Sequence, residues 1–225
     1  MNIGIIGAMD VEINKLKEHI KKDKVNHIAG FEFFEGTFNG NNIVLAISNE
    51  GKVNSAICTE IMCINYKLDL ILNVGVAGAI VENIKPLDTI ISSNTVEFDF
   101  DTTALGYEKG YVFGLNEVYM KCDNENLESL KNAAMKYSNM YVGTIASSDK
   151  FVVDALEKKK INEEFGAIAV DMESASICHV CNLNKNKFIA LRIVSDSGDN
   201  IEYRKFLELA TNKLTQIVVD FLNNV

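Results

Sequence analysis

The sequence predicts an α/β protein whose central sheet, mixed but largely parallel and twisted, is flanked by helices in a three-layer sandwich. Apolar runs alternate with amphipathic stretches along the chain, which is the pattern of βαβ units. Leu70–Val76 is a nearly unbroken apolar run, typical of a strand buried on both faces. Asn39-Gly40-Asn41 separates two apolar segments and predicts a hairpin, so the sheet cannot be purely parallel.

The individual elements follow from the same patterns in chain order. Ile3–Met9 is predicted as a buried strand, and Asp10–Lys22 as a helix whose apolar residues recur at helical spacing. The charged runs Lys21-Lys22 and Lys158-Lys159-Lys160 are interpreted as solvated helix faces. The remaining predicted strands are Phe31–Phe38, Asn42–Ser48, Leu70–Val76, Asp88–Val96, Tyr141–Ser147, Ala167–Asp171 and Phe188–Ser195. The remaining predicted helices are Val53–Tyr66, Glu125–Tyr137, Val152–Lys160, Glu173–Cys181 and Glu202–Leu222.

Length and composition limit the function classes. The 225 residues contain one proline and no Gly/Ser-rich linker, so we expect a single domain over residues 1–225. Acidic residues outnumber basic ones, 31 to 22, and a net charge of −9 makes nucleic acid an improbable partner. We expect no membrane association and a cytoplasmic protein, because no long apolar span and no basic leader precedes the first strand.

The cysteines and glycines favour no metal or organic cofactor. Cys178-His179-Val180-Cys181 has the spacing of a metal-binding pair, but no second Cys/His pair completes four ligands, so small buried thiols are the better interpretation. The five cysteines are expected to be free thiols in a reducing compartment. Gly4-x-x-Gly7 and Gly75-x-x-Gly78 do not complete a dinucleotide fingerprint, which disfavours a nicotinamide enzyme.

Carboxylates stand at the ends of three predicted strands, where ligands gather in α/β sheets. Glu12 follows the first strand, Glu173 follows the strand that ends at Asp171, and Asp196 ends the last strand. Glu12 could instead be an exposed residue of a first helical turn, and Asp196 a turn or cap residue. Because no histidine or cysteine joins them, the sequence predicts a carboxylate-based acid/base site.

Six segments in order carry a resemblance to a known family. They are Gly4-Ile5-Ile6-Gly7-Ala8-Met9-Asp10-Val11-Glu12, Gly51-Lys52-Val53-Asn54-Ser55-Ala56, Asn73-Val74-Gly75-Val76-Ala77-Gly78, Asp101-Thr102-Thr103-Ala104-Leu105-Gly106-Tyr107, Val170-Asp171-Met172-Glu173 and Arg192-Ile193-Val194-Ser195-Asp196. Together they resemble the 5′-methylthioadenosine/S-adenosylhomocysteine nucleosidases, within the wider nucleoside phosphorylase superfamily. The resemblance extends from Met1 to about Leu222 and implies a nucleoside phosphorylase-like fold.

The resemblance implies hydrolysis of the N-ribosidic bond of methylthioadenosine and adenosylhomocysteine, with 5′-deoxyadenosine as a further candidate substrate. Such a bond has a poor leaving group and a cationic transition state. By position, Asp196 matches the general acid that protonates N7 of the adenine. Glu12 matches the base that activates water, and Glu173 matches the residue that binds the ribose hydroxyls. No cofactor is implied, and the expected partner is a small purine nucleoside.

The remaining site residues also come from the resemblance. Met172 is expected to pack on the sugar, Phe151 to stack on the purine, and the backbone of Val152 to bind the adenine edge. Arg192 and Ser195 are expected to orient water and Asp196. The other substrate-binding candidates are Met9, Glu50, Val76, Tyr203 and, reaching across from the partner subunit of an expected homodimer, Leu105 and Phe113.

Positions where the sequence differs from the family pattern bear on the acceptor and on the preferred 5′ substituent. Asn73 and Val76 stand where related phosphorylases hold phosphate with an arginine and a serine, which favours water over phosphate. Glu50 stands where the family has an apolar residue near the 5′ substituent, so it either turns to solvent or meets a polar 5′ group such as the homocysteine ammonium. We expect a weaker preference for methylthioadenosine relative to polar 5′ groups than relatives show. The alternatives are a purine nucleoside phosphorylase of the same fold and a non-catalytic nucleoside-binding protein.

Overall fold

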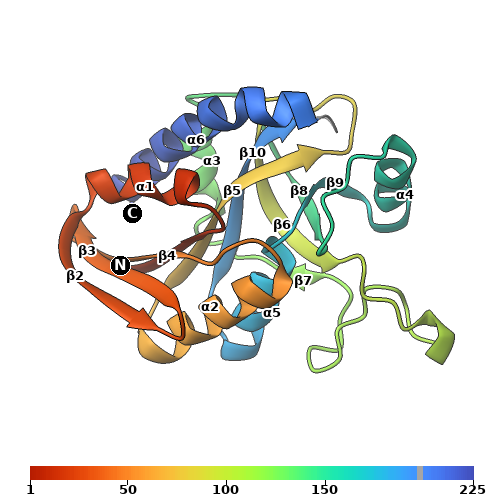
Figure 1. Cartoon of the computed structure of the whole chain (residues 1–225), viewed down its shortest axis with the longest axis horizontal. Coiled ribbons are helices and arrows are strands. Elements are labelled where there is room, and N and C mark those ends of the chain that lie inside the picture. Colours follow the sequence, from red (N-terminus) through yellow and green to blue (C-terminus); the bar gives the residue numbers. More distant parts are fainter. Residues whose placement is uncertain (197–199) are drawn as a thin grey trace.

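A mixed sheet with helices packed against it forms the body of the molecule (Figure 1). The computed structural model describes residues 1–196 and 200–225, with side chains for residues 1–195 and 206–225. The strands are β1 (Asn2–Gly7), β2 (Lys21–Ile28), β3 (Phe31–Phe38), β4 (Asn41–Ile47), β5 (Leu70–Ala79), β6 (Thr89–Glu97), β7 (Met120–Lys121), β8 (Met140–Ser147), β9 (Ala167–Asp171) and β10 (Phe188–Asp196). The helices are α1 (Asp10–His19), α2 (Lys52–Asn65), η1 (Thr103–Leu105), α3 (Leu127–Ala134), α4 (Ala155–Phe165), α5 (Ser174–Asn184) and α6 (Asn200–Leu222).

The sheet closes on itself, which the open three-layer sandwich did not predict. Its strand order is β10-β6-β8-β9-β5-β1-β4-β3-β2, with β7 beside β6, and β10 also pairs with β5. Strands β5, β10, β6, β8 and β9 therefore form a barrel. The physical reason is that β5 changes neighbours along its length: Leu70–Asn73 pairs with β1, whereas Gly78 and Ala79 pair antiparallel with β9. Closure leaves these strands without an unpaired edge.

Helices cover both faces of the sheet, as predicted. Helices α1, α3 and α6 lie on one side and α2 and α5 on the other (Figure 1). A large hydrophobic cluster lies on each face of the sheet, and adjacent residues of β1 belong to different clusters. Ile5 shares a cluster with Leu16 of α1, and Ile6 shares the other with Met62 of α2. Because β1 is buried on both faces, its side chains fix the distance of each helix layer from the sheet.

The predicted hairpin is present between β3 and β4. Asn39 and Gly40 have φ values of 46° and 84°. Two successive left-handed residues give the turn whose twist matches that of the flanking strands, and asparagine and glycine tolerate this backbone best. The hairpin adds antiparallel pairing to β1 and β4, which are parallel.

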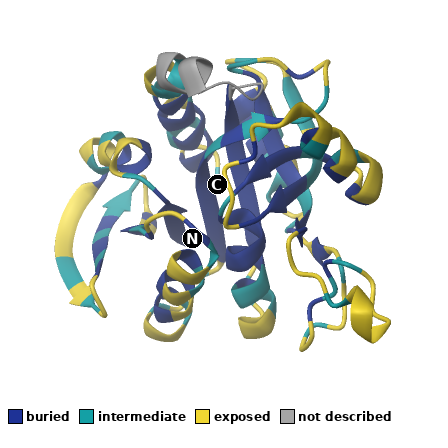
Figure 2. Cartoon of the chain, turned by 45° about the vertical axis from the view of Figure 1, so that its right-hand side comes forward, coloured by how far each residue is buried: buried dark blue, intermediate teal, exposed yellow. Residues whose placement is uncertain are grey.

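The two predictions about charged runs are wrong in part: Lys21 and Lys22 are exposed but not helical, and Lys159 and Lys160 are exposed on a helix whereas Lys158 is not. Lys21 and Lys22 do not end a helix but begin β2, which pairs antiparallel with β3 at the sheet edge and is largely exposed (Figure 2). A charged edge strand resists pairing with other chains and carries no apolar alternation that would reveal it. Lys158 is not solvated: it is buried in α4, and its Nζ donates to the carbonyl of Ala79 over 3.2 Å.

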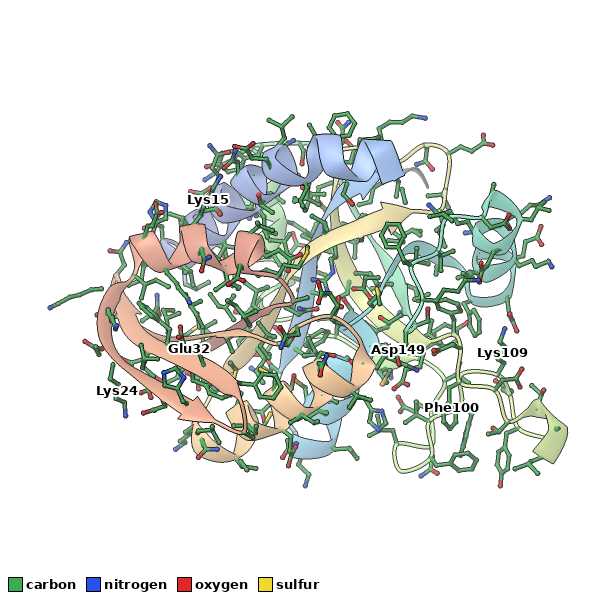
Figure 3. The ribbon with its side chains drawn as sticks, in the orientation of Figure 1. Lys15, Lys24, Glu32, Phe100, Lys109 and Asp149 are labelled. Carbon is green, nitrogen blue, oxygen red and sulfur yellow. The ribbon has the colours of Figure 1, made fainter. Side chains whose placement is uncertain are left out.

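The segment between β6 and β7 projects from the body and carries η1 at its tip (Figure 1). Within it, the rings of Tyr107, Tyr111 and Phe113 pack against one another at centroid distances of 4.8–5.3 Å. Phe100, labelled in Figure 3, lies in the same segment, 6.3 Å from the Phe113 ring. Among the described helices, none is long and apolar enough to cross a membrane.

Candidate active site

A cavity of about 340 Å³ opens where β1, β5, β9 and β10 end. Its position agrees with the rule that ligands bind beyond the carboxyl ends of strands in α/β sheets. Its lining combines carboxylates with apolar and small residues: Ala8, Met9, Glu12, Glu50, Val76, Ala77, Gly78, Lys150, Phe151, Val152, Val170, Asp171, Met172, Glu173 and Ser195.

Glu12 is buried in the first turn of α1 and is not the exposed helix residue that the alternative reading allowed. Its Oε2 accepts hydrogen bonds from the backbone N–H groups of Ala8 (2.8 Å) and Met9 (3.0 Å). Its Oε1 accepts one from the N–H of Val76 at 3.1 Å. Burial raises the pKa of this carboxyl, while the nearby Arg192 charge and the three N–H donors act in the opposite direction.

Gly75 of β5 leaves room for this carboxylate. A Cβ at that position would lie 2.7 Å from Glu12 Oε1 and 3.2 Å from Arg192 Nη1. Any other residue would push one of the two charged groups aside. The absence of a side chain therefore lets Glu12 and Arg192 meet over the same strand.

A buried ion pair lies behind the cavity floor. Arg192 donates from Nε to Asp171 Oδ2 at 2.8 Å, and its Nη2 lies 2.8 Å from the same oxygen. Arg192 Nη2 also donates to the amide oxygen of Asn73. The Asn73 amide nitrogen in turn donates to the carbonyl of Ile6 at 2.9 Å. With both ends of its amide engaged inside the protein, Asn73 holds Arg192 rather than facing the cavity.

Glu173 lies between β9 and α5 and is also buried. Its Oε1 accepts a single backbone hydrogen bond, from the N–H of Gly51 at 3.0 Å. Burial and the neighbouring Asp171 charge raise the pKa of Glu173 to about 8, against the opposing effect of Arg192. A neighbouring cation or additional hydrogen-bond donors would favour the ionised form of this carboxyl.

The apolar side of the cavity comes from three segments. Phe151 is 44 % exposed at its rim, Val152 is buried below it, and Met172 lies between the two buried acids Asp171 and Glu173. Ser195, at the end of β10, is buried and lines the same space. An aromatic ring together with apolar side chains in the lining suits a planar heterocycle.

Five predicted site residues are exposed, or have side chains outside the described residues, and so differ from the buried residues of the cavity. Glu50 lines the cavity but is exposed. Leu105 and Phe113 are exposed in the projecting segment and do not line the cavity of their own chain. The backbone of Asp196 ends β10 beside Gly78, but its side chain lies outside the described residues, as does the side chain of Tyr203 in α6.

The sequence patterns do not predict the roles of two residues of the site, Asp171 and Gly51. Asp171 was seen only as part of a strand end, yet it is the partner of Arg192, from which it is separated by 21 positions in the chain. Gly51 supplies the N–H that binds Glu173. A charged residue inside an otherwise apolar strand, as Arg192 is in β10, was the available sign of a buried ion pair.

The Cys178–Cys181 segment is part of α5, and both thiols are buried. His179 points elsewhere: its Nδ1 lies 2.9 Å from Glu97 Oε1. Within the described residues, no three His, Cys, Asp or Glu side chains are grouped so as to hold a metal ion.

Comparison with known proteins gives consistent matches over the full length. The sequence model of the phosphorylase superfamily matches residues 2–223. The 5′-methylthioadenosine/S-adenosylhomocysteine nucleosidase of Anoxybacillus flavithermus is 34 % identical over 232 residues, covering 99 % of this chain and 100 % of the relative.

Solved structures match equally well. The 5′-methylthioadenosine/S-adenosylhomocysteine nucleosidase of Neisseria meningitidis, in complex with methylthio-immucillin-A, has a TM-score of 0.95 at 31 % identity, with 100 % of this chain and 99 % of that chain covered. The futalosine hydrolase of Helicobacter pylori has a TM-score of 0.94 at 28 % identity, with 100 % and 98 % covered.

Proposed function

This chain belongs to the phosphorylase superfamily and, within it, to the 5′-methylthioadenosine/S-adenosylhomocysteine nucleosidases, and from that premise we propose the chemistry of its pocket. It is a hydrolase that cleaves the N-ribosidic bond of methylthioadenosine and adenosylhomocysteine, releasing adenine and the 5′-substituted ribose. In the proposed mechanism water is the acceptor, Glu12 is the general base and Asp196 is the general acid.

The choice of water as the acceptor rests on one observation: the cationic side chains Arg192 and Lys150 at the described cavity are already paired with carboxylates of the protein. Arg192 is paired with Asp171, and Asn73 is bonded at both ends of its amide. Lys150 Nζ lies 2.8 and 2.7 Å from the two carboxylate oxygens of Glu157. A phosphate co-substrate would meet the Glu12 carboxylate with no unpaired cation among these groups to offset the repulsion. Water is therefore the better nucleophile.

Glu12 suits the role of base because its carboxylate is fixed by three backbone N–H groups. A held carboxylate reaches its water without reorganising in the transition state. Glu173 suits the ribose hydroxyls because it lies beside Met172 in the lining. As a carboxylate it would accept hydrogen bonds from these hydroxyls, and its charge would stabilise the oxocarbenium-like sugar more than the neutral ground state.

Asp196 is proposed as the acid at N7 because β10 brings its backbone beside Gly78, which lines the cavity. Phe151 would stack on the purine and the backbone of Val152 would bind its edge, with Met9, Val76 and Met172 against the sugar. Arg192 and Ser195 would orient the water and the acid. Tyr203 is proposed near the 5′ substituent.

The proposed assembly is a cytoplasmic homodimer of single-domain subunits. Leu105 and Phe113, which are exposed in the projecting segment and do not line the cavity of their own chain, would complete the 5′ pocket of the partner. The one family match over residues 2–223 supports a single domain. Sedimentation of the purified chain at micromolar concentration tests the dimer: one species of twice the chain mass is expected, and a monomer contradicts it.

The substrate is tested by adenine release from methylthioadenosine, adenosylhomocysteine, 5′-deoxyadenosine and adenosine, with futalosine as a separate arm because a futalosine hydrolase shares the fold. We expect turnover of the two thio-nucleosides well above that of adenosine. Turnover of futalosine alone would replace the proposed substrates, and no turnover of any nucleoside would favour a binding role.

A further inference from the structure

Three charged residues from three segments close a ring beside the cavity. Asp149 follows β8, Lys52 begins α2 and Asp99 follows β6. Asp149 Oδ1 accepts from the backbone N–H of Lys52 at 2.7 Å, and Asp99 Oδ1 accepts from Lys52 Nζ at 2.6 Å. The ring is completed by the Asp149 N–H, which donates to Asp99 Oδ2 at 3.3 Å. Figure 3 labels Asp149 close to the beginning of α2.

The ring joins two parts of the cavity wall. On one side, Asp149 directly precedes Lys150, Phe151 and Val152, which line the cavity. On the other side, the N–H of Gly51, next to Lys52, binds Glu173 at 3.0 Å. Two adjacent N–H groups at the start of α2 are thus held by two carboxylates, one from each part of the wall. Negative charge is favoured at this end of a helix.

Gly51 shows how closely the parts approach. Its φ of 95° is unfavourable for other residues, and a Cβ there would lie 3.0 Å from Asp149 Oδ1. The rest of α2 is held independently, because Cys58 and Met62 are buried in the core. Breaking the ring would therefore release the start of the helix and the loop after β8 while leaving the body of α2 packed.

From this geometry we infer that Asp149 is a positioning residue that sets the distance between the purine side of the cavity, Phe151 and Val152, and its ribose side, Glu173. The inference rests on the proposed nucleosidase function for the naming of these two sides. Asp149 touches neither base nor sugar; it acts through the loop that follows it and through Lys52. A misplacement of about 1 Å between bound groups can cost about 100-fold in rate.

The test compares Asp149→Ala with Asp149→Asn. Alanine removes the acceptor, and we expect about a 30-fold loss in kcat on methylthioadenosine and about a 10-fold rise in the Kd of adenine measured by calorimetry. Asparagine keeps an oxygen that can accept from the Lys52 N–H, so it should restore both values to within about threefold of wild type.

Asp154→Ala is the matched control. Asp154 is an exposed aspartate on the same loop whose Oδ1 accepts from the N–H of Glu157, at the start of α4, at 2.8 Å. Its loss removes the same kind of bond from a helix that the ring does not include. We expect a drop in Tm similar to that of Asp149→Ala, but kcat and adenine affinity close to wild type.

Three outcomes overturn the inference: kinetics of Asp149→Ala within twofold of wild type, equal kinetic losses in Asp149→Ala and Asp154→Ala, or no recovery in Asp149→Asn. If Asp149→Ala does not fold, Asp99→Ala removes both acceptors on the exposed side of the ring and should weaken adenine binding in the same direction; unchanged affinity contradicts the role. Adenine binding can be measured without turnover, so the two claims are tested separately. A wild-type protein that binds adenine but cleaves no nucleoside would contradict the proposed function. The Kd of adenine in the variants would still decide the role of Asp149.

Discussion

Glu12 and Glu173 face the same cavity and are both buried, yet the two ends of the pocket hold them differently. Glu12 receives three backbone hydrogen bonds and lies near Arg192. Glu173 receives one backbone hydrogen bond and lies beside the charge of Asp171. Burial raises the pKa of both carboxyls, but the other contributions differ. Three N–H donors and Arg192 act against burial at Glu12, whereas the Asp171 charge adds to the effect of burial at Glu173.

The different surroundings of the two carboxyls fit the different roles proposed for them. A carboxylate that is already held by N–H groups can orient a nucleophile with little rearrangement, as Glu12 is proposed to do. A carboxylate beside the sugar contributes most when the sugar becomes cationic in the transition state, as Glu173 is proposed to do. The Asp171–Arg192 pair lies between them and influences both.

The largest expected effect is on the Glu12 side. Glu12→Gln keeps the size of the side chain but removes the base, so kcat on methylthioadenosine should fall about 10²- to 10⁴-fold. The affinity for adenine should stay within a few fold of wild type. Glu18→Gln is the control, because Glu18 is an exposed glutamate on the same helix. A loss below tenfold in kcat would show that another group activates the water.

The second effect concerns the ion pair that both sides share. Asp171→Ala leaves the buried Arg192 charge without its carboxylate, which should lower the free energy of unfolding by about 3–5 kcal/mol. Urea denaturation followed by circular dichroism measures it. Lys159→Ala, which removes one partner of an exposed ion pair with Glu163, should change stability by less than about 1 kcal/mol. Equal effects of the two substitutions would mean that the buried pair is not the stabilising feature.

The third prediction uses the pKa of about 8 at Glu173. Between its ordinary pKa of 4.5 and about 8, the folded protein keeps a proton that the unfolded chain has released. The stability due to this group is therefore complete at low pH and is lost as the pH rises through about 8. Glu173→Gln should flatten the fall of Tm between pH 5 and pH 9. An unchanged slope would assign the proton to another group.

The smallest effect is expected at the cavity mouth. Glu50 is an exposed carboxylate in the lining, and it is proposed to meet a polar or cationic 5′ group. Glu50→Ile should shift the ratio of kcat/KM for methylthioadenosine over adenosylhomocysteine toward methylthioadenosine, by about tenfold at most. Glu60→Ile, at an exposed glutamate of α2 that does not line the cavity, should leave the ratio unchanged. An unchanged ratio in Glu50→Ile would place the carboxylate away from the 5′ substituent.

The sequence was sufficient for most strands and for the position of the pocket, because buried strands carry long apolar runs and ligands bind at strand ends. It was insufficient where exposure hides a strand, as in β2, whose charged residues at Lys21 and Lys22 look like a helix face. Barrel closure depends on the pairing of Gly78 with Val170, which no local pattern encodes. Lys158 is buried because its amino group reaches the Ala79 carbonyl of a neighbouring strand, and only the fold brings the two together.

The candidate site shows the same limit. Glu12 and Glu173 could be predicted from their places after strands, whereas their different environments depend on Arg192, Asn73 and Gly51, which come from distant parts of the chain. The role of Asp171 as partner of Arg192 likewise appears only once β9 and β10 are arranged around the same barrel.

The central claim is that water, not phosphate, accepts the sugar in this pocket. Its most direct test is the initial rate of adenine release from methylthioadenosine, measured in phosphate-free buffer and at rising phosphate concentration, with the sugar product identified by mass. The account predicts the same rate throughout and free 5-methylthioribose as the product. A rate that vanishes without phosphate, with a sugar 1-phosphate as product, would contradict it.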